Sequence, residues 1–189
     1  MSITCLDTAK YNEASSLIAV CKSDSQQHGA ILRAAHYKLG SLIAEQIARN
    51  LPNQQITVVI MMRAGLCFGM GIADGLEYAS IETPVLFHYN NEQWKKETSN
   101  CPHALNNTML LVDAVINTGE SIIMFSDQLT QSRQIIFAAN VISKKGLKNF
   151  EDKEVYAVRI SENSFVGSKN AVARDGKGPD TGDRLFNTR

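Results

Sequence analysis

The first third of the chain carries a helical pattern of apolar residues. Between residues 32 and 47, leucine, isoleucine and alanine recur at intervals of three and four, which places them on one face of an α-helix. Ser23 and Gln26 have the spacing of a capping box ahead of this stretch, and Pro52 indicates its end. The pattern therefore predicts a helical N-terminal region over residues 1–53.

Five later segments are short, continuously apolar and rich in β-branched residues, at 57–62, 84–89, 108–113, 134–141 and 155–160. Such runs are typical of strands that are buried on both faces of a sheet. Three predicted helices separate them: a Gly-rich helix that runs to residue 76, and helices over residues 122–129 and 144–150. This alternation predicts right-handed crossovers, and hence an α/β fold whose central, mainly parallel sheet is flanked by helices.

Two segments have no periodic pattern. Residues 90–107 are polar and contain Trp94, so we expect a loop or hairpin there. Residues 166–189 hold several glycines and Pro179, and we expect an ordered loop with a functional role rather than a regular element. The length fits one domain that spans residues 1–189.

Composition and charge mainly exclude other classes of protein. The 189 residues include 19 basic and 19 acidic side chains, and 44% are hydrophobic. Zero net charge argues against a nucleic-acid-binding protein that works by bulk charge, and the apolar content excludes disorder of the whole chain. The pattern contains no membrane-spanning run and no signal peptide, so we expect a soluble cytoplasmic protein with reduced cysteines.

The most informative stretch for chemistry covers residues 109–121. An apolar strand ends at Asp113, and a short loop closes at Thr118-Gly119-Glu120-Ser121, where a helix begins. Backbone N–H groups at such a turn, together with the Thr118 and Ser121 hydroxyls, can bind an anion. The Asp113 carboxylate is suited to accept hydrogen bonds from ribose hydroxyls, so this loop could bind a sugar phosphate. The alternative is a strand whose last aspartate caps a turn before a Ser/Thr-rich helix start.

Residues 109–121 also resemble the phosphoribosyl-pyrophosphate (PRPP) loop of the type I phosphoribosyltransferases. Residues 62–66, Met-Arg-Ala-Gly-Leu, with residues 73–76 downstream, resemble the pyrophosphate-side segment of the uracil phosphoribosyltransferase branch. Residues 180–188, Asp-Thr-Gly-Asp-Arg-Leu-Phe-Asn-Thr, resemble its terminal signature. As in that branch, no second acid follows Asp113. The resemblance extends from about Asp24 to the end of the chain.

This resemblance implies a type I phosphoribosyltransferase-like domain with a small hood or hairpin region. It implies transfer of the 5-phosphoribosyl group from PRPP to a nucleobase, uracil above all, giving UMP and pyrophosphate in pyrimidine salvage. Mg²⁺ would be the cofactor, and the partners would be PRPP, a nucleobase and a second copy of the chain in a homodimer or larger homo-oligomer. No nucleic acid and no membrane are expected as partners.

The resemblance also implies roles for individual residues. Arg63 would bind pyrophosphate and Asp113 the ribose hydroxyls, as the two catalytic residues, while Asp180 would contact PRPP-bound Mg²⁺ through water. Asp183 and Arg184 are expected to form an ion pair that holds the tail. The implied PRPP-binding residues are Arg63, Ala64, Gly65, Asp113, Ala114, Val115, Ile116, Asn117, Thr118, Gly119, Glu120, Ser121 and Asp180, and the base-binding residues are Arg174, Pro179, Asp180 and Thr181.

The sequence departs from the family pattern at two places that bear on function. Asn90 stands where the uracil enzymes carry a second PRPP-binding arginine, although Lys95 or Lys96 could supply a point charge. Arg174 and Asp175 occupy the positions where the uracil enzymes carry an apolar-Pro-Gly segment that recognises uracil. Two alternatives therefore stay open: a phosphoribosyltransferase for a different base, and a non-catalytic protein on the same fold that senses PRPP or a nucleotide.

Overall fold

The computed structural model describes residues 2–52, 54–88, 107–130, 132–163 and 180–188. In this part of the chain the strands form one six-stranded sheet in the order β1-β6-β5-β4-β2-β3, and all neighbouring pairs are parallel. The strands are β1 (Ser2–Cys5), β2 (Ile56–Met61), β3 (Val85–His88), β4 (Thr108–Ile116), β5 (Gln134–Ser143) and β6 (Glu154–Ser161). The predicted α/β fold with a central, mainly parallel sheet is confirmed.

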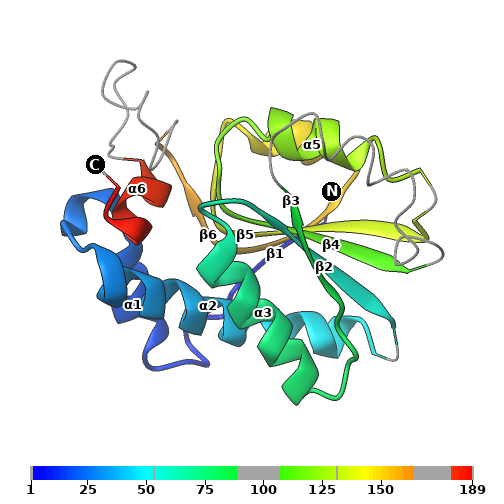
Figure 1. Ribbon diagram of the computed structural model, residues 1–189, viewed down its shortest axis with the longest axis horizontal. Helices are drawn as coiled ribbons and strands as arrows, with labels where there is room; N and C mark the ends of the chain where they lie inside the picture. Colours follow the sequence, from blue (N-terminus) through cyan, green and yellow to red (C-terminus); the bar gives the residue numbers. More distant parts are fainter. Residues whose placement is uncertain (1, 53, 89–106, 131, 164–179, 189) are drawn as a thin grey trace.

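Helices cover both faces of this sheet (Figure 1). One face carries α1 (Ala14–Cys21), α2 (Gly29–Asn50) and α3 (Leu66–Tyr78), and the other carries α5 (Glu120–Ser126) and the 3₁₀ helix η4 (Leu147–Phe150). The last helix, α6 (Thr181–Phe186), lies beside α2. This layered arrangement leaves the carboxyl ends of the strands, where the loops begin, as one edge of the sheet.

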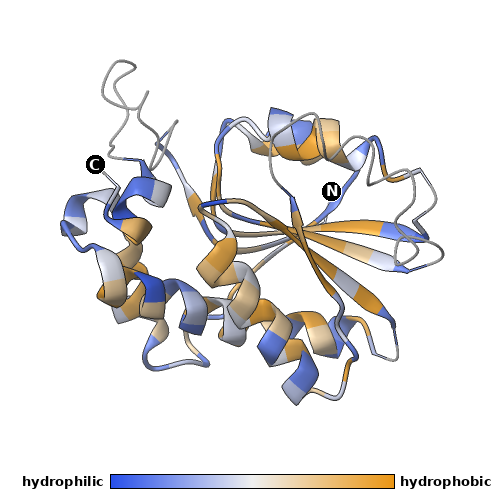
Figure 2. Cartoon of the chain, in the orientation of Figure 1, coloured by the Kyte–Doolittle hydropathy of each residue, from blue (hydrophilic) through white to orange (hydrophobic). Residues whose placement is uncertain are grey.

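The core consists of two apolar layers, one on each face of the sheet. In β2 every residue is buried, and its side chains alternate between the layers. Val58 and Ile60 pack with α2 and α3, whereas Val59 and Met61 pack with α5. Apolar strands therefore lie between two sets of amphipathic helices (Figure 2), as expected for a sheet that is buried on both faces.

Two glycines let α2 and α3 approach each other at backbone distance. A Cβ added at Gly40 would lie 2.2 Å from the Phe68 carbonyl oxygen, and one at Gly71 would lie 2.0 Å from that of Tyr37. No side chain fits at either position. The close contact holds α3 against α2, so that the loop at the start of α3 has a defined position.

The N-terminal region differs from its sequence prediction in two respects. Residues 1–53 were expected to be helical, but Ser2–Cys5 forms the edge strand β1, which pairs with β6. Ser23 lies in a short 3₁₀ helix, η1 (Ser23–Ser25), and α2 begins only at Gly29 without a side-chain cap. The predicted capping box is therefore wrong, although the apolar stripe of the long helix is confirmed. Among the described helices, none is long and apolar enough to cross a membrane.

Candidate functional site

The sequence-predicted residues that the structure describes converge on the carboxyl edge of the sheet. Asp113 lies in β4, and Arg63 follows the neighbouring strand β2. The contact between these segments is close: a Cβ added at Gly65 would lie 2.9 Å from the Val112 carbonyl oxygen and 3.4 Å from the Asp113 Cα. A glycine at position 65 is therefore needed for the turn after β2 to reach β4.

The loop that follows β4 is shorter than the sequence predicts. The strand was expected to end at Asp113, but its pairing with β5 continues to Ile116, so Ala114 and Val115 belong to the strand. Asn117, Thr118 and Gly119 form the turn into α5, and we call them the phosphate loop. Gly119 has φ of +82°, a backbone conformation that L-residues with a side chain rarely adopt.

A cavity of about 170 Å³ lies along this loop, lined by Asp113, Val115, Ile116, Asn117, Thr118, Gly119, Glu120, Ser121 and Ile122. The lining therefore includes most of the predicted PRPP-binding residues of this segment. It brings one carboxylate, the loop backbone and two hydroxyl side chains to the same hollow. That combination can contact both the hydroxyls and the phosphate of a sugar phosphate.

Asp113 has an unusual electrostatic environment. Burial of its carboxyl group raises the pKa to about 7 from an ordinary value of 3.8, and the nearby charge of Asp180 acts in the same direction. The backbone N–H groups of Ala114 and Val115 donate to the carboxylate and oppose the shift. Asp113 therefore changes its charge near neutral pH, as functional carboxylates often do.

Asp180, whose charge contributes to the raised pKa of Asp113, begins the C-terminal helix. Its Oδ1 accepts a hydrogen bond of 3.1 Å from the Asp183 N–H, which makes it the N-cap of α6. The tail was expected to be irregular from residue 166 onward, so the helix at Thr181–Phe186 corrects that prediction. The cap and the burial of Leu185 stabilise a helix that the glycine content of the tail does not suggest.

The carboxylates of Asp113 and Asp180 are oxygen donors of the type that Mg²⁺ prefers. Among the described residues, no group of three or more His, Cys, Asp or Glu side chains could hold a metal alone. Mg²⁺ commonly uses one or two carboxylates and completes its shell with water and substrate phosphates.

Arg63 is oriented by the C-terminal segment. Its Nη2 donates to Asp183 Oδ1 at 2.9 Å and its Nη1 donates to Thr188 Oγ1 at 2.9 Å. The Asp183 side chain is only 7% exposed, whereas that of Arg63 is 49% exposed. A guanidinium has five N–H donors, so the exposed side of Arg63 can bind an anion while Asp183 and Thr188 hold its other side.

The expected ion pair between Asp183 and Arg184 is therefore wrong. Arg184 is 1% exposed and points away from Asp183 into the N-terminal region. Its guanidinium donates to the carbonyl oxygens of Gln27 and Lys22, at 3.0 Å each, and to Ser25 Oγ at 3.1 Å. The buried arginine thus attaches α6 to the segment before α2 and leaves Asp183 for Arg63.

Of the predicted base-binding residues, the structure describes Asp180 and Thr181. Thr181 is buried at the first turn of α6 and lies next to Asp180. Arg174 and Pro179 lie outside the described residues, as do Asn90, Lys95 and Lys96. Thr181 also lines a small polar cavity with His36 and Asn140.

His36 and Asn140 form a buried polar pair that the sequence analysis missed. Asn140 Nδ2 lies 3.2 Å from His36 Nδ1. Within the described part of the chain, His36 Nε2 and Asn140 Oδ1 have no hydrogen-bond partner. Burial, together with the nearby charge of Arg184, lowers the pKa of His36 to about 3. His36 interrupts an apolar face of α2, and Asn140 interrupts the apolar strand β5. Neither residue belongs to a local sequence motif that would indicate a functional site.

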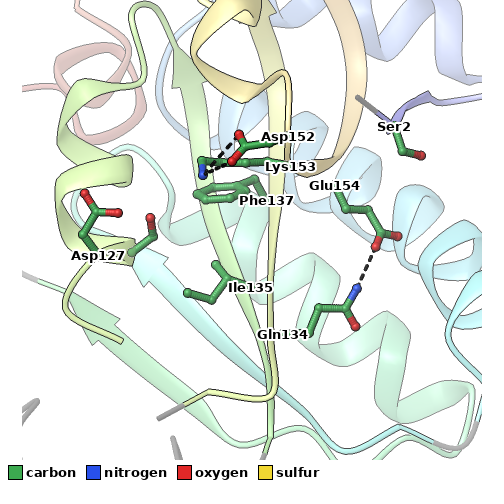
Figure 3. A pocket seen from close by; sticks show the side chains of 9 residues that line it. Ser2, Asp127, Gln134, Ile135, Phe137, Asp152, Lys153 and Glu154 are labelled. Atoms are coloured by element: carbon green, nitrogen blue, oxygen red, sulfur yellow. Dashed lines mark hydrogen bonds and ion pairs between the residues drawn. The ribbon is translucent and has the colours of Figure 1, made fainter. Parts of the chain in front are cut away.

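A larger hollow, of about 570 Å³, lies at the opposite edge of the sheet, where β1, β5 and β6 begin (Figure 3). Its polar side chains are mostly paired with each other: Gln134 donates to Glu154 at 2.8 Å, and Lys153 lies 3.4 Å from Asp152. None of the sequence-predicted site residues is among those that line it. We therefore assign the functional site to the smaller hollow at the phosphate loop.

Comparison with known proteins identifies the family and the fold of this chain. The model of the uracil phosphoribosyltransferase family matches residues 24–188. A uracil phosphoribosyltransferase of Ligilactobacillus salivarius is 27% identical over 162 residues, which cover 78% of this chain and 72% of the relative. A solved protein of Aquifex aeolicus covers 98% of both chains with a TM-score of 0.69 at 16% identity. The hypoxanthine-guanine phosphoribosyltransferase of Leishmania tarentolae, solved with GMP, covers 66% of this chain and 78% of its own, with a TM-score of 0.53 at 11% identity.

Proposed function

We propose that this chain, which belongs to the uracil phosphoribosyltransferase family, transfers the 5-phosphoribosyl group of PRPP to uracil and releases UMP and pyrophosphate. The phosphoribosyltransferase class follows from the family. Uracil as the acceptor rests on the family description and on a relative of 27% identity. The observation that carries the proposal is the convergence of Arg63, Asp113, Asp180 and the phosphate loop on one edge of the sheet.

In this proposal the two ends of PRPP bind to different parts of the site. The phosphate loop binds the 5-phosphate through backbone N–H groups and the Thr118 and Ser121 hydroxyls. Asp113 accepts hydrogen bonds from the ribose hydroxyls, and Arg63 binds the pyrophosphate. Each contact positions the substrate, so the rate enhancement comes mainly from the orientation of the reacting groups.

The chemical step is a displacement at C1 of the ribose. A ring nitrogen of the base attacks C1, a C–N bond forms, the bond from C1 to pyrophosphate breaks, and the nitrogen's proton is lost to solvent or a base. Positive charge develops on the ribose and negative charge on the leaving group. The ionised Asp113 stabilises the former and Arg63 the latter, in a site that is already oriented before the reaction.

Mg²⁺ is proposed to enter with PRPP as part of the substrate complex. It supplies charge neutralisation for the leaving pyrophosphate. Asp180, together with Asp113, would hold the water shell of the ion. We also propose a homodimer as the working assembly, which light scattering of the purified protein would test.

A second candidate function is kept because two predicted substrate contacts depart from the family pattern. Asn90 replaces an arginine, and Arg174 with Asp175 replaces the segment that reads uracil. These residues favour a phosphoribosyltransferase for another base, or a non-catalytic sensor of PRPP. All three readings require PRPP at the same edge of the sheet.

One experiment separates the three readings. The purified protein is incubated with PRPP, Mg²⁺ and, in turn, uracil, hypoxanthine, guanine, adenine and orotate, and nucleotide and pyrophosphate are quantified. We expect UMP to be the main product. A purine nucleotide without UMP would replace the base assignment, and no product despite calorimetric PRPP binding would indicate the sensor. Asp113→Asn is the matched control for contaminating activity.

A further inference from the structure

We propose that Ser143 and Asn149 are positioning residues that aim the phosphate loop at the 5-phosphate of the substrate. Ser143 is the last residue of β5, and Asn149 lies in η4, which precedes β6. Neither residue lines the cavity along the loop, so they act through the loop backbone. This inference rests on the proposed function, because it assigns the residues that shape the PRPP site.

Both residues hold carbonyl groups of the phosphate loop. The Ser143 hydroxyl donates to the Asn117 carbonyl oxygen, and Asn149 Nδ2 donates to the Thr118 carbonyl oxygen at 2.8 Å. These carbonyls belong to consecutive residues, so two successive peptide planes are fixed from the same side. Ser143 is itself oriented, since its Oγ accepts a 3.0 Å hydrogen bond from the Gly146 N–H.

Peptide geometry converts these carbonyl contacts into an orientation of N–H groups. In a trans peptide the C=O of one residue and the N–H of the next point in opposite directions. A fixed Asn117 carbonyl therefore turns the Thr118 N–H away from Ser143, and a fixed Thr118 carbonyl turns the Gly119 N–H away from Asn149. Successive N–H groups that face the same side form an anion-binding concavity.

Close packing prevents the phosphate loop from moving toward the segment that follows β5. A Cβ added at Gly146 would lie 2.1 Å from the Asn117 carbonyl oxygen, and one at Gly119 would lie 2.4 Å from Phe150 Cε2. Phe150 is fully buried and packs edge-on against Phe137 at 5.1 Å between ring centres. The segment after β5 is thus a rigid support behind the phosphate loop.

The test separates the two ends of PRPP by using ribose 5-phosphate and pyrophosphate as individual probes. Asn149→Ala and Ser143→Ala each remove one support, and Asn149→Asp replaces the donor by an acceptor at the same size. Gln46→Ala is the matched control, because Gln46 Nε2 donates to the carbonyl oxygen of Cys5 at 3.1 Å in a similar amide–backbone contact. The measurements are steady-state kinetics and the calorimetric Kd of each probe.

We expect Asn149→Ala to raise KM for PRPP and Kd for ribose 5-phosphate about three- to tenfold, as for the loss of one hydrogen bond. Kd for pyrophosphate should stay within about twofold and kcat within about threefold, because Arg63 and Asp113 are unchanged. Asn149→Asp should weaken ribose 5-phosphate at least as much. Gln46→Ala should leave both Kd values unchanged.

Several outcomes would overturn the inference. Equal loss of affinity for both probes, or the same pattern in Gln46→Ala, would make Asn149 and Ser143 ordinary structural residues. If Asn149→Ala does not fold by circular dichroism, the isosteric Asn149→Asp decides by the same comparison. A wild-type protein that binds neither PRPP nor ribose 5-phosphate would remove the proposed function as well, whereas an active wild type with unaffected variants would remove only this inference.

Discussion

The phosphate loop and Arg63 lie at the same edge of the sheet but are supported by different parts of the chain. The loop is held by Ser143 and Asn149, which are 26 and 31 residues away in the next βαβ unit. Arg63 is held by Asp183 and Thr188, which are 120 and 125 residues away. One half of the site is complete once neighbouring strands have paired, and the other requires the C-terminal helix to dock.

Arg184 makes that docking specific. A buried guanidinium is stabilised only when its donors are satisfied, and Arg184 finds its acceptors in the segment before α2. The pyrophosphate side of the site is therefore linked to the N-terminal helices through α6. On the phosphate side, the described contacts of the loop carbonyls come from Ser143 and Asn149 instead, so the two sides should respond differently to substitution.

Replacement of Arg63 should have the largest effect on activity. Arg63→Ala removes the cation expected to neutralise the leaving pyrophosphate, and we expect a loss of about 100- to 1,000-fold in kcat/KM, as for a lost transition-state donor. Kd for ribose 5-phosphate should change little. Steady-state kinetics and calorimetry check both statements.

A double variant separates the catalytic loss from a stability loss. Arg63→Ala leaves the nearly buried Asp183 carboxylate without its cation, which lowers the melting temperature. Asp183→Asn in the same chain should restore the melting temperature, because it removes that charge, but it should not restore turnover. If turnover returns with stability, Arg63 is a structural residue.

Asp113→Asn should have the second-largest effect on activity. It weakens a charged hydrogen bond to the ribose worth roughly 1.5–3 kcal/mol, so kcat/KM should fall about ten- to hundredfold. The folded-state pKa of Asp113 is raised above its ordinary value, so the ionised group destabilises the free protein as pH rises from about 4 to 7. The variant should therefore melt at a higher temperature than wild type at pH 8, and unfolding of the variant would make Asp113 a structural cap.

The pH dependence of activity should come from the same residue. Only the ionised carboxylate accepts charge-assisted hydrogen bonds from both ribose hydroxyls, and burial raises its pKa to about 7. kcat/KM for PRPP should therefore fall about fivefold between pH 7 and pH 6, and by about tenfold for each further pH unit, as the proton is bound. Asp113→Asn should lack this decline, and an unchanged acidic limb in that variant would assign it to another group.

Thr188→Val should have the smallest effect and sharpen the contrast between the two sides. Thr188 Oγ1 accepts one hydrogen bond from Arg63 and donates one to Asp183 Oδ1 at 3.0 Å. Because Asp183 still orients Arg63, Kd for pyrophosphate should rise only about two- to threefold, and Kd for ribose 5-phosphate should not change. Equal effects on both probes would contradict the separation of the two sides.

The local patterns of the sequence predicted much of the fold. Buried strands show themselves as continuous apolar runs, and the alternation with helices predicts parallel pairing. The phosphate loop could also be predicted, because Asp113, Thr118, Gly119 and Ser121 are contiguous and their chemistry is local. The strand end at Ile116 was missed, because Asp113 interrupts the apolar run three residues before the strand ends.

Other features were decided only by tertiary contacts. The four residues of β1 are too few for a pattern and become a strand by pairing with β6. The Gly-containing tail forms α6 because Asp180 caps it and Leu185 is buried. His36 and Asn140 meet although they are 104 residues apart, which no periodicity signals.

By itself, the sequence determined the parallel α/β architecture and the loop that follows β4, because side-chain period and turn chemistry act between near neighbours. Only the tertiary structure decided that Asp183 pairs with Arg63 rather than with Arg184. On a helix, adjacent residues point in different directions, so Asp183 faces the site while Arg184 enters the protein. The partner of each charged side chain is set by the segment that packs against its face of α6. Those segments lie more than 100 residues away in the sequence.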